Sequence, residues 1–222
     1  RDPAPSPAPC AYHHRASHLA PVPLIRNQVD GAKFNQGRSL PYQLRIADFA
    51  LVMQDVYDFF FDVNTLLQGK GLERLDDMLR PAIMSGLLSD MLTASMGKHS
   101  RTLTENRYHN GHPDLIVRGK YSNNRVQAGT EGVEIKSTRK IGGGVDMHGA
   151  RDQWLCVFVY GVDEESEPAT DRRPMAFTEV YLAQVTMADF RENPRHTALG
   201  TRTSALNRAG ITNFRRGWVY RL

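Results

Sequence analysis

Apolar residues recur at three- and four-residue intervals along residues 39–67, which predicts one long amphipathic helix. Ser39 is a suitable N-cap and Pro41 suits a first helical turn. Gly69 and Gly71 predict the end of this helix. Its apolar positions are Leu44, Ala47, Leu51, Val52, Val56, Phe59, Phe60, Val63 and Leu67.

Two shorter helical regions are predicted next. Residues 72–79 carry a helical pattern, and a new helix is expected to begin at Pro81, since proline is favoured in a first turn. Gly97 is a typical C-terminal stop. Residues 48–92 hold eight acidic and three basic residues, which indicates a solvated outer face on these helices.

After residue 100 the hydrophobic period changes to that of strands. Asn110-Gly111 is a strong hairpin signal between the segments 101–109 and 113–117. The segment 154–160 is apolar on both faces, so we expect a buried central strand covered by helices. The remaining predicted features are a turn at 122–124 and strands at 132–138 and 177–185.

Short elements are expected in the last third of the chain. Residues 163–173 have the composition of an acidic surface loop. Thr186 is a suitable cap for a short helix through Arg191, and a further helix is predicted over 204–209, ended by Gly210. Helices first, then a mixed sheet, then short elements indicate an α/β or α+β fold.

The first 23 residues are rich in proline, and we expect them to form an extended or disordered tail because they bury too little apolar surface. Residues 24–222 are predicted to form one domain, with a helical part at 39–97, a sheet core at 101–185 and a basic part at 195–222. A zinc site in the tail is the less favoured alternative. Its ligands would be Cys10, His13, His14 and His18.

The charge of the chain is small in total but unevenly placed. The 222 residues have a formal net charge of +4, yet residues 195–222 contain six arginines and no Asp or Glu. Such clusters fit a polyanionic partner better than the net value does. Two cysteines cannot build a disulfide framework, and no apolar run has the length of a membrane span. We therefore expect a cytoplasmic protein with no membrane partner.

Asp114 and the run Glu134-Ile135-Lys136 form the most informative polar pattern. Alternate residues of a strand project to one face, so Glu134 and Lys136 are expected to point together, opposite Ile135. Asp114 joins this polar face if the two predicted strands are neighbours. Two adjacent carboxylates need a compensating cation, and Mg²⁺ accepts carboxylate and carbonyl oxygens. A lysine beside them can orient water and stabilise charge on a phosphoryl group.

Pro113-Asp114, followed twenty residues later by Glu134-Ile135-Lys136, resembles the motif of the PD-(D/E)xK nuclease superfamily, which includes type II restriction endonucleases. The resemblance covers about residues 80–160. It implies a restriction-endonuclease-like core, in which helices flank a central mixed β-sheet. It also implies that Asp114 and Glu134 are catalytic metal ligands, that the Ile135 carbonyl is a further ligand, and that Lys136 orients the water.

The activity that the resemblance implies is Mg²⁺-dependent DNA endonuclease activity, in which metal-activated water hydrolyses a phosphodiester bond. Mn²⁺ can substitute in such enzymes, and cleavage of both strands usually takes a homodimer. Many members use a further acidic residue, for which Asp90 and Glu105 are the candidates. Gln153 is followed by Tyr160 rather than by a tyrosine four residues later, which argues against the RecB-like branch.

Basic residues near the catalytic strand and at the C-terminus are candidate DNA contacts. The glycine-rich loop after the strand could instead be merely flexible. The C-terminus could be a final strand that buries Phe214, Trp218 and Tyr220 and leaves its arginines in solvent. The candidate contacts are Arg139, Lys140, His148, Arg151, Arg215 and Arg216.

Three other interpretations of the whole pattern stay open. The protein could be a nucleic-acid-binding module of the same fold without catalysis, which would bind DNA in a salt-dependent way and cut nothing. It could be an RNA-processing nuclease. Finally, Asp114 could cap a turn while Glu134 and Lys136 form a surface pair on an edge strand.

Overall fold

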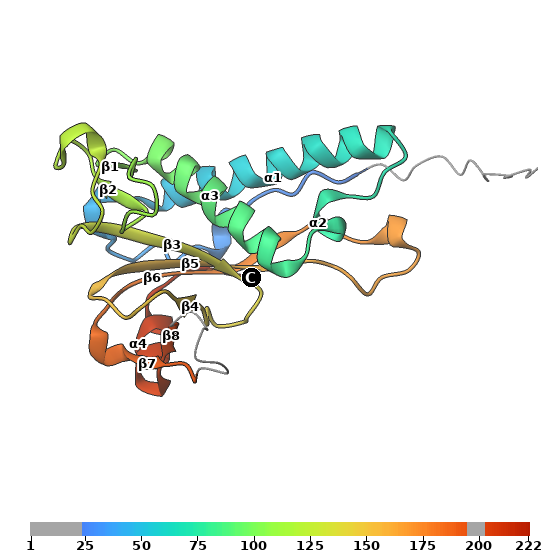
Figure 1. The fold of residues 1–222 in the computed structure, drawn as a ribbon. Helices are drawn as coiled ribbons and strands as arrows, with labels where there is room; N and C mark the ends of the chain where they lie inside the picture. Colours follow the sequence, from blue (N-terminus) through green and yellow to red (C-terminus); the bar gives the residue numbers. More distant parts are fainter. Residues whose placement is uncertain (1–23, 195–202) are drawn as a thin grey trace, which may run out of the picture.

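The computed structural model describes residues 24–194 and 203–222, which form a mixed α/β fold around a six-stranded sheet (Figure 1). The predicted tail with its candidate zinc ligands lies outside the described residues. The helices are α1 (Ile46–Gly69), α2 (Leu75–Met78), α3 (Pro81–His99) and α4 (Arg208–Arg216). The strands are β1 (Leu103–Glu105), β2 (Leu115–Val117), β3 (Gly132–Thr138), β4 (Asp146–Met147), β5 (Gln153–Gly161), β6 (Ala176–Val185), β7 (Phe190–Glu192), β8 (Ser204–Leu206) and β9 (Trp218–Arg221).

The large sheet is mixed and has the strand order β1-β2-β3-β5-β6-β9. β3 and β5 are parallel, and the other neighbouring strands are antiparallel. A second sheet contains β4, β8 and β7. Within the described strands, β2 pairs with β3 only at Gly132 and Val133. The rest of β3 therefore has a strand neighbour on one side alone, and its other edge is open.

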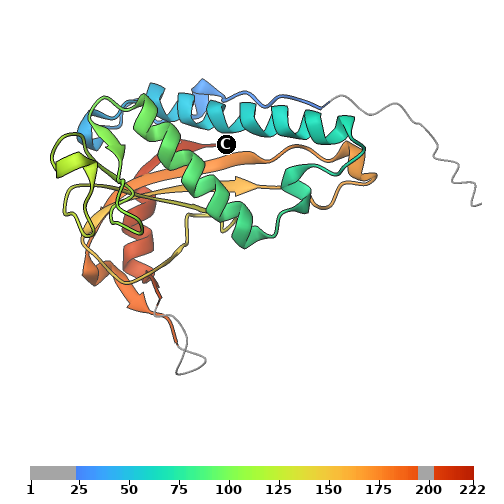
Figure 2. The ribbon, with the colours of Figure 1, turned by 45° about the horizontal axis from the view of Figure 1, so that its top comes forward.

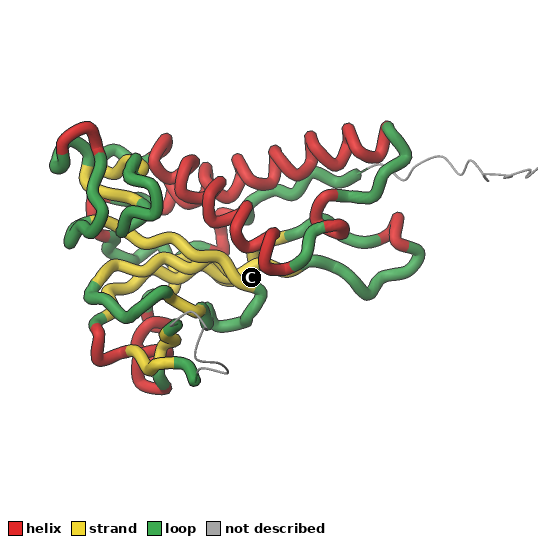
Figure 3. The backbone as a smooth tube through the Cα atoms, viewed as in Figure 1, coloured by secondary structure: helices red, strands yellow, loops and turns green. Residues whose placement is uncertain are grey.

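Elements cover both faces of the large sheet. α1 and α3 lie across one face, whereas α4 and the small sheet lie against the other (Figures 1 and 2). The tube view separates the layers most clearly, with helices above the strands and α4 below them (Figure 3). This arrangement buries the large sheet between two layers.

β5 is the central strand that the sequence predicted. Cys156, Phe158 and Tyr160 belong to the apolar cluster beneath α1 and α3. The alternate residues Leu155, Val157 and Val159 belong to a second cluster, formed with α4 and the small sheet. Because both faces are covered, an apolar run without alternation is the expected sequence for this strand.

The predicted long helix is confirmed as α1, but it begins later than expected. Ser39 is not its cap, because residues 41–43 form a separate 3₁₀ turn in which Tyr42 has a φ of 53°. The helix starts after Arg45, whose main-chain N–H donates to Asp48 Oδ2 at 2.9 Å. This carboxylate caps the first turn and sets the start of the helix.

α3 begins at Pro81 as predicted, but Gly97 does not end it. The helix continues to His99, and Gly97 is buried where α3 crosses the β1–β2 hairpin. A Cβ atom at this position would lie 3.2 Å from the main-chain nitrogen of Glu105. The glycine therefore permits close packing rather than a helix stop. The predicted helix over 72–79 shortens to the single turn of α2.

The elements after residue 186 differ most from the prediction. Thr186 does cap a 3₁₀ turn, but Phe190–Glu192 is the strand β7. Residues 204–206 form β8 instead of a helix, because they pair with both β4 and β7.

Gly210 does not end a helix but lies inside α4, which begins after Asn207. A Cβ atom at Gly210 would lie 2.3 Å from the carbonyl oxygen of Asp189, so this glycine also serves close packing.

Candidate active site

Asp114, Glu134 and Lys136 meet at the open edge of β3. Leu115 and Val133 are opposed in the β2–β3 pair and face the cluster under α1 and α3. Asp114, the residue before Leu115, and Glu134, the residue after Val133, therefore face the other side of the sheet. Glu134 is 1% exposed, while the side chains of Asp114 and Lys136 are 28% and 26% exposed. The predicted neighbourhood of the two strands and the shared polar face are confirmed.

The ammonium of Lys136 lies among three oxygen atoms. Its Nζ is 2.6 Å from Glu134 Oε1, 3.1 Å from the main-chain oxygen of Ile135 and 3.5 Å from Asp114 Oδ2. These oxygens belong to the three residues that the sequence predicted as metal ligands. A positive charge of the chain itself thus compensates the two carboxylates, whose repulsion would otherwise oppose their approach.

Asp114 also provides an acceptor for one backbone N–H group of β3. Its Oδ2 accepts a hydrogen bond of 2.8 Å from the main-chain N–H of Ile135. This N–H lies beyond the residues that pair with β2, and a buried N–H needs an acceptor. The side chain of Asp114 replaces the missing strand and is fixed beside Glu134.

His112 holds the second oxygen of Glu134, a contact that the sequence pattern did not predict. Its Nδ1 lies 3.3 Å from Glu134 Oε2, while Lys136 contacts Oε1. Both oxygens of this buried carboxylate therefore have a partner, which restrains its orientation. The available sequence signal was the position of His112, directly before Pro113-Asp114.

Asn106 fixes the loop that carries these residues. Its Nδ2 donates to the carbonyl oxygens of Pro113 at 3.1 Å and Val126 at 2.8 Å. Its Oδ1 accepts from the main-chain N–H groups of Tyr108 and Val126, both at 3.1 Å. The side chain uses both donors and both lone pairs. Nothing in the local sequence distinguishes it from an ordinary loop asparagine.

The environment shifts the pKa of each charged group. Burial raises the pKa of Asp114 above its ordinary value, with Lys136 opposing and Glu134 reinforcing the shift. Burial also disfavours the charge of Glu134, but Lys136 and His112 outweigh it and lower the pKa of that carboxyl. Burial likewise disfavours the ammonium of Lys136, yet the two carboxylates prevail and raise its pKa. Lys136 is therefore a stable cation beside a buried carboxylate.

Two cavities flank the site. One of about 760 Å³ opens beside Lys136, between α3 and the loop after β3. The other, of about 600 Å³, lies beside Asp114, between α3 and the β1–β2 hairpin. Asp90 of α3 lines both cavities, whereas Glu105 lines only the second. Of the two candidate additional acids, Asp90 is the better placed to extend the site.

Three of the predicted DNA contacts line the larger cavity, namely Arg139, Lys140 and His148. Arg139 is paired with Glu164 at 2.7 Å, and Lys140 Nζ lies 3.5 Å from Asp146 Oδ2. Arg151 does not line the cavity and is half-buried. The structure thus brings together part of this predicted set.

Arg215 and Arg216 lie on α4, away from both cavities. Arg215 Nε donates to the main-chain oxygen of Gly142 at 3.0 Å and so ties α4 to the loop after β3. Both side chains are exposed, while Phe214 is buried. The aromatic residues of this segment pack inward as the alternative interpretation predicted, although Phe214 lies in a helix rather than in the final strand.

The site has the oxygen donors that a hard divalent cation requires. Within the described residues, no group of three or more His, Cys, Asp and Glu side chains could hold a metal ion. The donors here are instead two carboxylates and one main-chain carbonyl, and all three already converge on a cation, the ammonium of Lys136. This oxygen set suits Mg²⁺.

Comparison of the chain with family models, with curated proteins and with solved structures gives no match. The resemblance to PD-(D/E)xK nucleases therefore stays a prediction, carried by the residues of the β2–β3 edge. No helix in the described ranges combines the length and the apolar character needed to cross a membrane.

Proposed function

We propose that this protein is a Mg²⁺-dependent DNA endonuclease with a restriction-endonuclease-like core. The observation that carries the proposal is the convergence of Asp114 Oδ2, Glu134 Oε1 and the Ile135 carbonyl oxygen on one positive charge at an open strand edge. Glu134 and Lys136 lie two residues apart on β3, and Asp114 approaches them from the position directly before β2. This spacing and this convergence support the resemblance to the nuclease motif.

Each residue has a distinct role in the proposed reaction. Asp114, Glu134 and the Ile135 carbonyl would hold Mg²⁺, which supplies positive charge at the phosphate and lowers the pKa of a bound water. Lys136 orients the attacking water and neutralises charge that develops on the phosphoryl oxygens. His112 keeps the Glu134 carboxylate in position through Oε2. The expected products carry 5′-phosphate and 3′-hydroxyl ends.

The surroundings of the site support a polyanionic substrate. The cavity beside Lys136 is also lined by Arg139, Lys140 and His148. Cationic side chains beside a phosphodiester bind the nucleic-acid backbone without specifying the base sequence. Cleavage of both strands requires two such sites, so we propose that the active form is a homodimer. A cytoplasmic location belongs to the same proposal.

The test is cleavage of supercoiled plasmid by the parent and by the Asp114→Ala and Lys136→Ala variants, with Mg²⁺, with Mn²⁺ and with EDTA. Lys120→Ala is the matched control, because Lys120 also pairs with a glutamate, Glu131, but lies outside the site. The proposal expects cleavage by the parent and the control in either metal, and none by the two site variants. Equal cleavage by Lys136→Ala and the parent would refute it.

Two further substrates separate the alternatives. Structured RNA and single-stranded DNA are digested beside duplex DNA under the same conditions. Preference for RNA would identify an RNA-processing nuclease. Salt-dependent binding of duplex DNA without cleavage in either metal would identify a binding module that has lost catalysis.

A further inference from the structure

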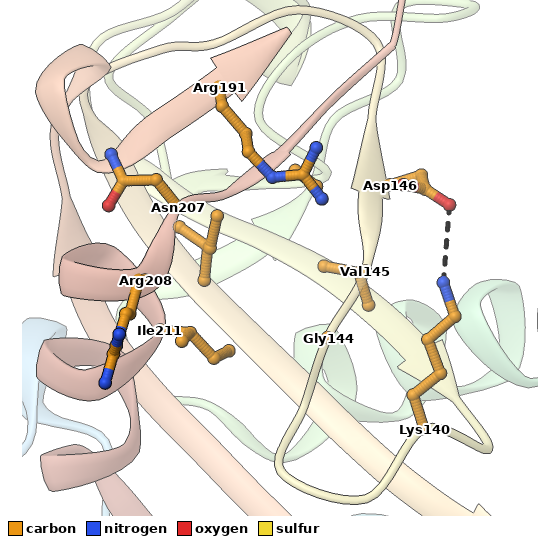
Figure 4. Close-up of a pocket in the computed structure, with 10 residues that line it drawn as sticks. Lys140, Gly144, Val145, Asp146, Arg191, Asn207, Arg208 and Ile211 are labelled. Carbon is orange, nitrogen blue, oxygen red and sulfur yellow. Dashed lines mark ion pairs between the residues drawn. The ribbon is translucent and has the colours of Figure 1, made fainter. Parts of the chain in front are cut away.

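A groove of about 350 Å³ lies between α4 and the small sheet, and we call it the α4 groove (Figure 4). Lys140, Arg191 and Arg208 contribute its positive charges, and Ala205 and Ile211 are among its apolar lining residues. In Figure 4 the side chain of Arg191 extends from β7 across the groove toward β4. None of the proposed catalytic residues lines it.

The α4 groove adjoins the cavity beside Lys136. The two hollows share Lys140, Gly144, Val145 and Asp146 as lining residues. They therefore meet at the segment that joins β3 to β4. A linear molecule held at the edge of β3 can reach α4 past this shared segment.

Two of the three positive charges of the groove have no acidic partner among the described residues. Lys140 has an acidic partner, Asp146, at 3.5 Å, and Asp146 also accepts a hydrogen bond from Asn193 at 2.9 Å. Within the described residues, no ion pair joins Arg191 or Arg208 to a carboxylate. The strongest contact of Arg191 in that set is a 3.5 Å hydrogen bond to Asn193.

The small sheet fixes the spacing of Arg191 and Asp146, the basic and the acidic residue that it contributes to the groove. Ala205 of β8 is opposed to Arg191 of β7 on one side and to Asp146 of β4 on the other. Directly opposed residues of an antiparallel pair project to the same face, so the three side chains share one face. The methyl group of Ala205 leaves the space between the two charged side chains open.

Asn207 fixes α4, and with it Arg208, against the 3₁₀ turn Met187–Asp189 that precedes the strand carrying Arg191. Its side-chain oxygen accepts from Gly210 N at 2.8 Å and its Nδ2 donates to the carbonyl oxygen of Ala188 at 2.8 Å. Its main-chain N–H donates to the carbonyl oxygen of Asp189 at 2.8 Å. The two arginines are thus attached to one rigid junction, which lowers the entropy lost when both contact a single ligand.

We propose that the α4 groove binds the DNA backbone at a phosphate distant from the cleaved bond, through Arg191, Arg208 and Lys140. The inference rests on the proposed function, because DNA is the linear polyanion that the catalytic edge would hold. Guanidinium groups match the geometry of phosphate oxygens, and contacts of this kind position a duplex without specifying its sequence.

The experiment measures binding of a fluorescein-labelled 30-base-pair duplex to the full chain in EDTA, between 50 and 200 mM salt. For Arg191→Ala/Arg208→Ala we expect the slope of log K against log salt to become shallower by about 1.8, since each phosphate contact contributes about 0.9. We expect Kd at 100 mM salt to rise about tenfold. Cleavage rates are then measured with Mg²⁺ over a range of DNA concentrations. The same variant should keep the kcat of the parent at saturating DNA and show a raised KM.

Two further variants make the result specific. Arg191→Lys/Arg208→Lys keeps both charges and should restore most of the slope. Lys70→Ala/Arg173→Ala removes two charges that are exposed on the described surface outside the groove, and it should bind like the parent. The inference is overturned if the groove variant and this control have the same Kd and the same slope.

The outcomes also separate this inference from the proposed function. If the parent cleaves DNA but the groove variant keeps the KM and the slope of the parent, only the α4 groove assignment fails. If the slope depends on the groove but no metal supports cleavage, the endonuclease proposal fails and the groove remains a DNA-binding site. Absence of any DNA binding overturns both.

Discussion

Lys136 Nζ lies 2.6 Å from Glu134 Oε1, and the same ammonium lies 3.5 Å from Asp114 Oδ2. In this arrangement the lysine occupies the position in which a divalent cation would neutralise the two carboxylates. Because two cations within a few ångströms repel, Mg²⁺ at the proposed site would compete with the ammonium for these oxygens. This competition predicts how substitution of the site residues changes the affinity for a divalent metal ion, which can be measured without a nucleic acid.

Replacement of Lys136 by methionine should increase the affinity of the protein for Mg²⁺ or Mn²⁺ in the absence of DNA. We expect a gain of at least tenfold, since a unit charge about 4 Å away contributes about 4 kcal/mol at an effective dielectric constant near 20 and about 1.4 kcal/mol already corresponds to a factor of ten. Glu134→Gln should instead weaken binding. Isothermal titration calorimetry measures both, with Lys120→Met as the control. A Lys136→Met protein that binds the metal no better than the parent contradicts the arrangement.

Asp55 should make folding stability sensitive to acid. Burial raises its pKa, but hydrogen bonds from His99, Ser95 and Lys98 outweigh this effect and hold the pKa below its usual value of 3.8. Stability from a lowered carboxyl pKa is present above the unfolded value and is lost as the pH falls through the folded value. The side chain is 36% exposed, so we expect about 1 kcal/mol at most.

The measurement for Asp55 is urea unfolding of the parent and of Asp55→Asn at pH 3, 4, 5 and 7. The difference in free energy of unfolding should be largest at pH 5 and above and should shrink below pH 4. Asp62→Asn serves as the control, because the side chain of Asp62 is 69% exposed. A difference that stays constant across this range would show that the Asp55 contacts do not depend on its charge.

Gly132 should not tolerate a side chain. Its φ is 143°, and a Cβ atom there would lie 1.9 Å from the carbonyl oxygen of Leu115. Gly132→Ala must therefore separate β2 from β3, and we expect a loss of about 3 kcal/mol or more. Gly37→Ala is the matched control, because a Cβ atom there meets nothing within 4 Å. Thermal unfolding of the two variants compares them, and equal melting temperatures would contradict the β2–β3 geometry.

Asn106→Ala should reduce both the stability of the protein and the proposed cleavage activity. The variant leaves main-chain groups of the Asp114 loop without their partners, at a cost of about 2–3 kcal/mol. Because the same loop positions His112 and Asp114, cleavage should fall even at temperatures at which the variant is folded. Asn213→Ala, an exposed position on α4, is the control. Activity equal to that of the parent, measured below the unfolding transition, would show that the loop does not depend on Asn106.

Cys156 should be inert in the folded protein. It is 1% exposed at the centre of β5, and burial raises the pKa of its thiol. Reaction requires a thiolate, so a Cys10→Ser protein should not react with Ellman's reagent until guanidinium unfolds it. The expected protection of the native thiol is at least about a thousandfold, since exposure of this strand requires global opening, which costs about 5 kcal/mol or more. Rapid reaction of the native protein would contradict the central position of β5.

The pattern of the sequence predicted the types of the main elements because their signals are local. The three- and four-residue spacing of α1 and the unbroken apolar run of β5 each depend on neighbouring residues. The shared face of Glu134 and Lys136 follows from the two-residue period of a strand in the same way. These features were confirmed. The chain also reverses near Asn110, but β1 ends at Glu105 and β2 begins at Leu115, so the connection is longer than the tight hairpin turn that Asn110-Gly111 predicted.

Glycine positions misled the prediction wherever a glycine serves packing. Gly97 and Gly210 resemble helix stops, yet both lie inside helices that another chain segment approaches closely. The approaching atoms belong to Glu105 and Asp189, and neither contact can be read from the local sequence. For the same reason residues 204–206, which form a strand only by pairing with β4 and β7, were predicted as a helix.

The sequence alone thus determined which chemical groups the candidate site at the β3 edge would contain and that Glu134 and Lys136 would share a face. Only the tertiary structure decided that β2 pairs with β3 at two residues, which leaves the edge open for Asp114 to accept from Ile135 N. It also decided that Arg191 and Arg208 lie in one groove. The physical reason is that backbone periodicity acts over a few residues, whereas strand register and charge proximity depend on contacts between distant segments of the chain.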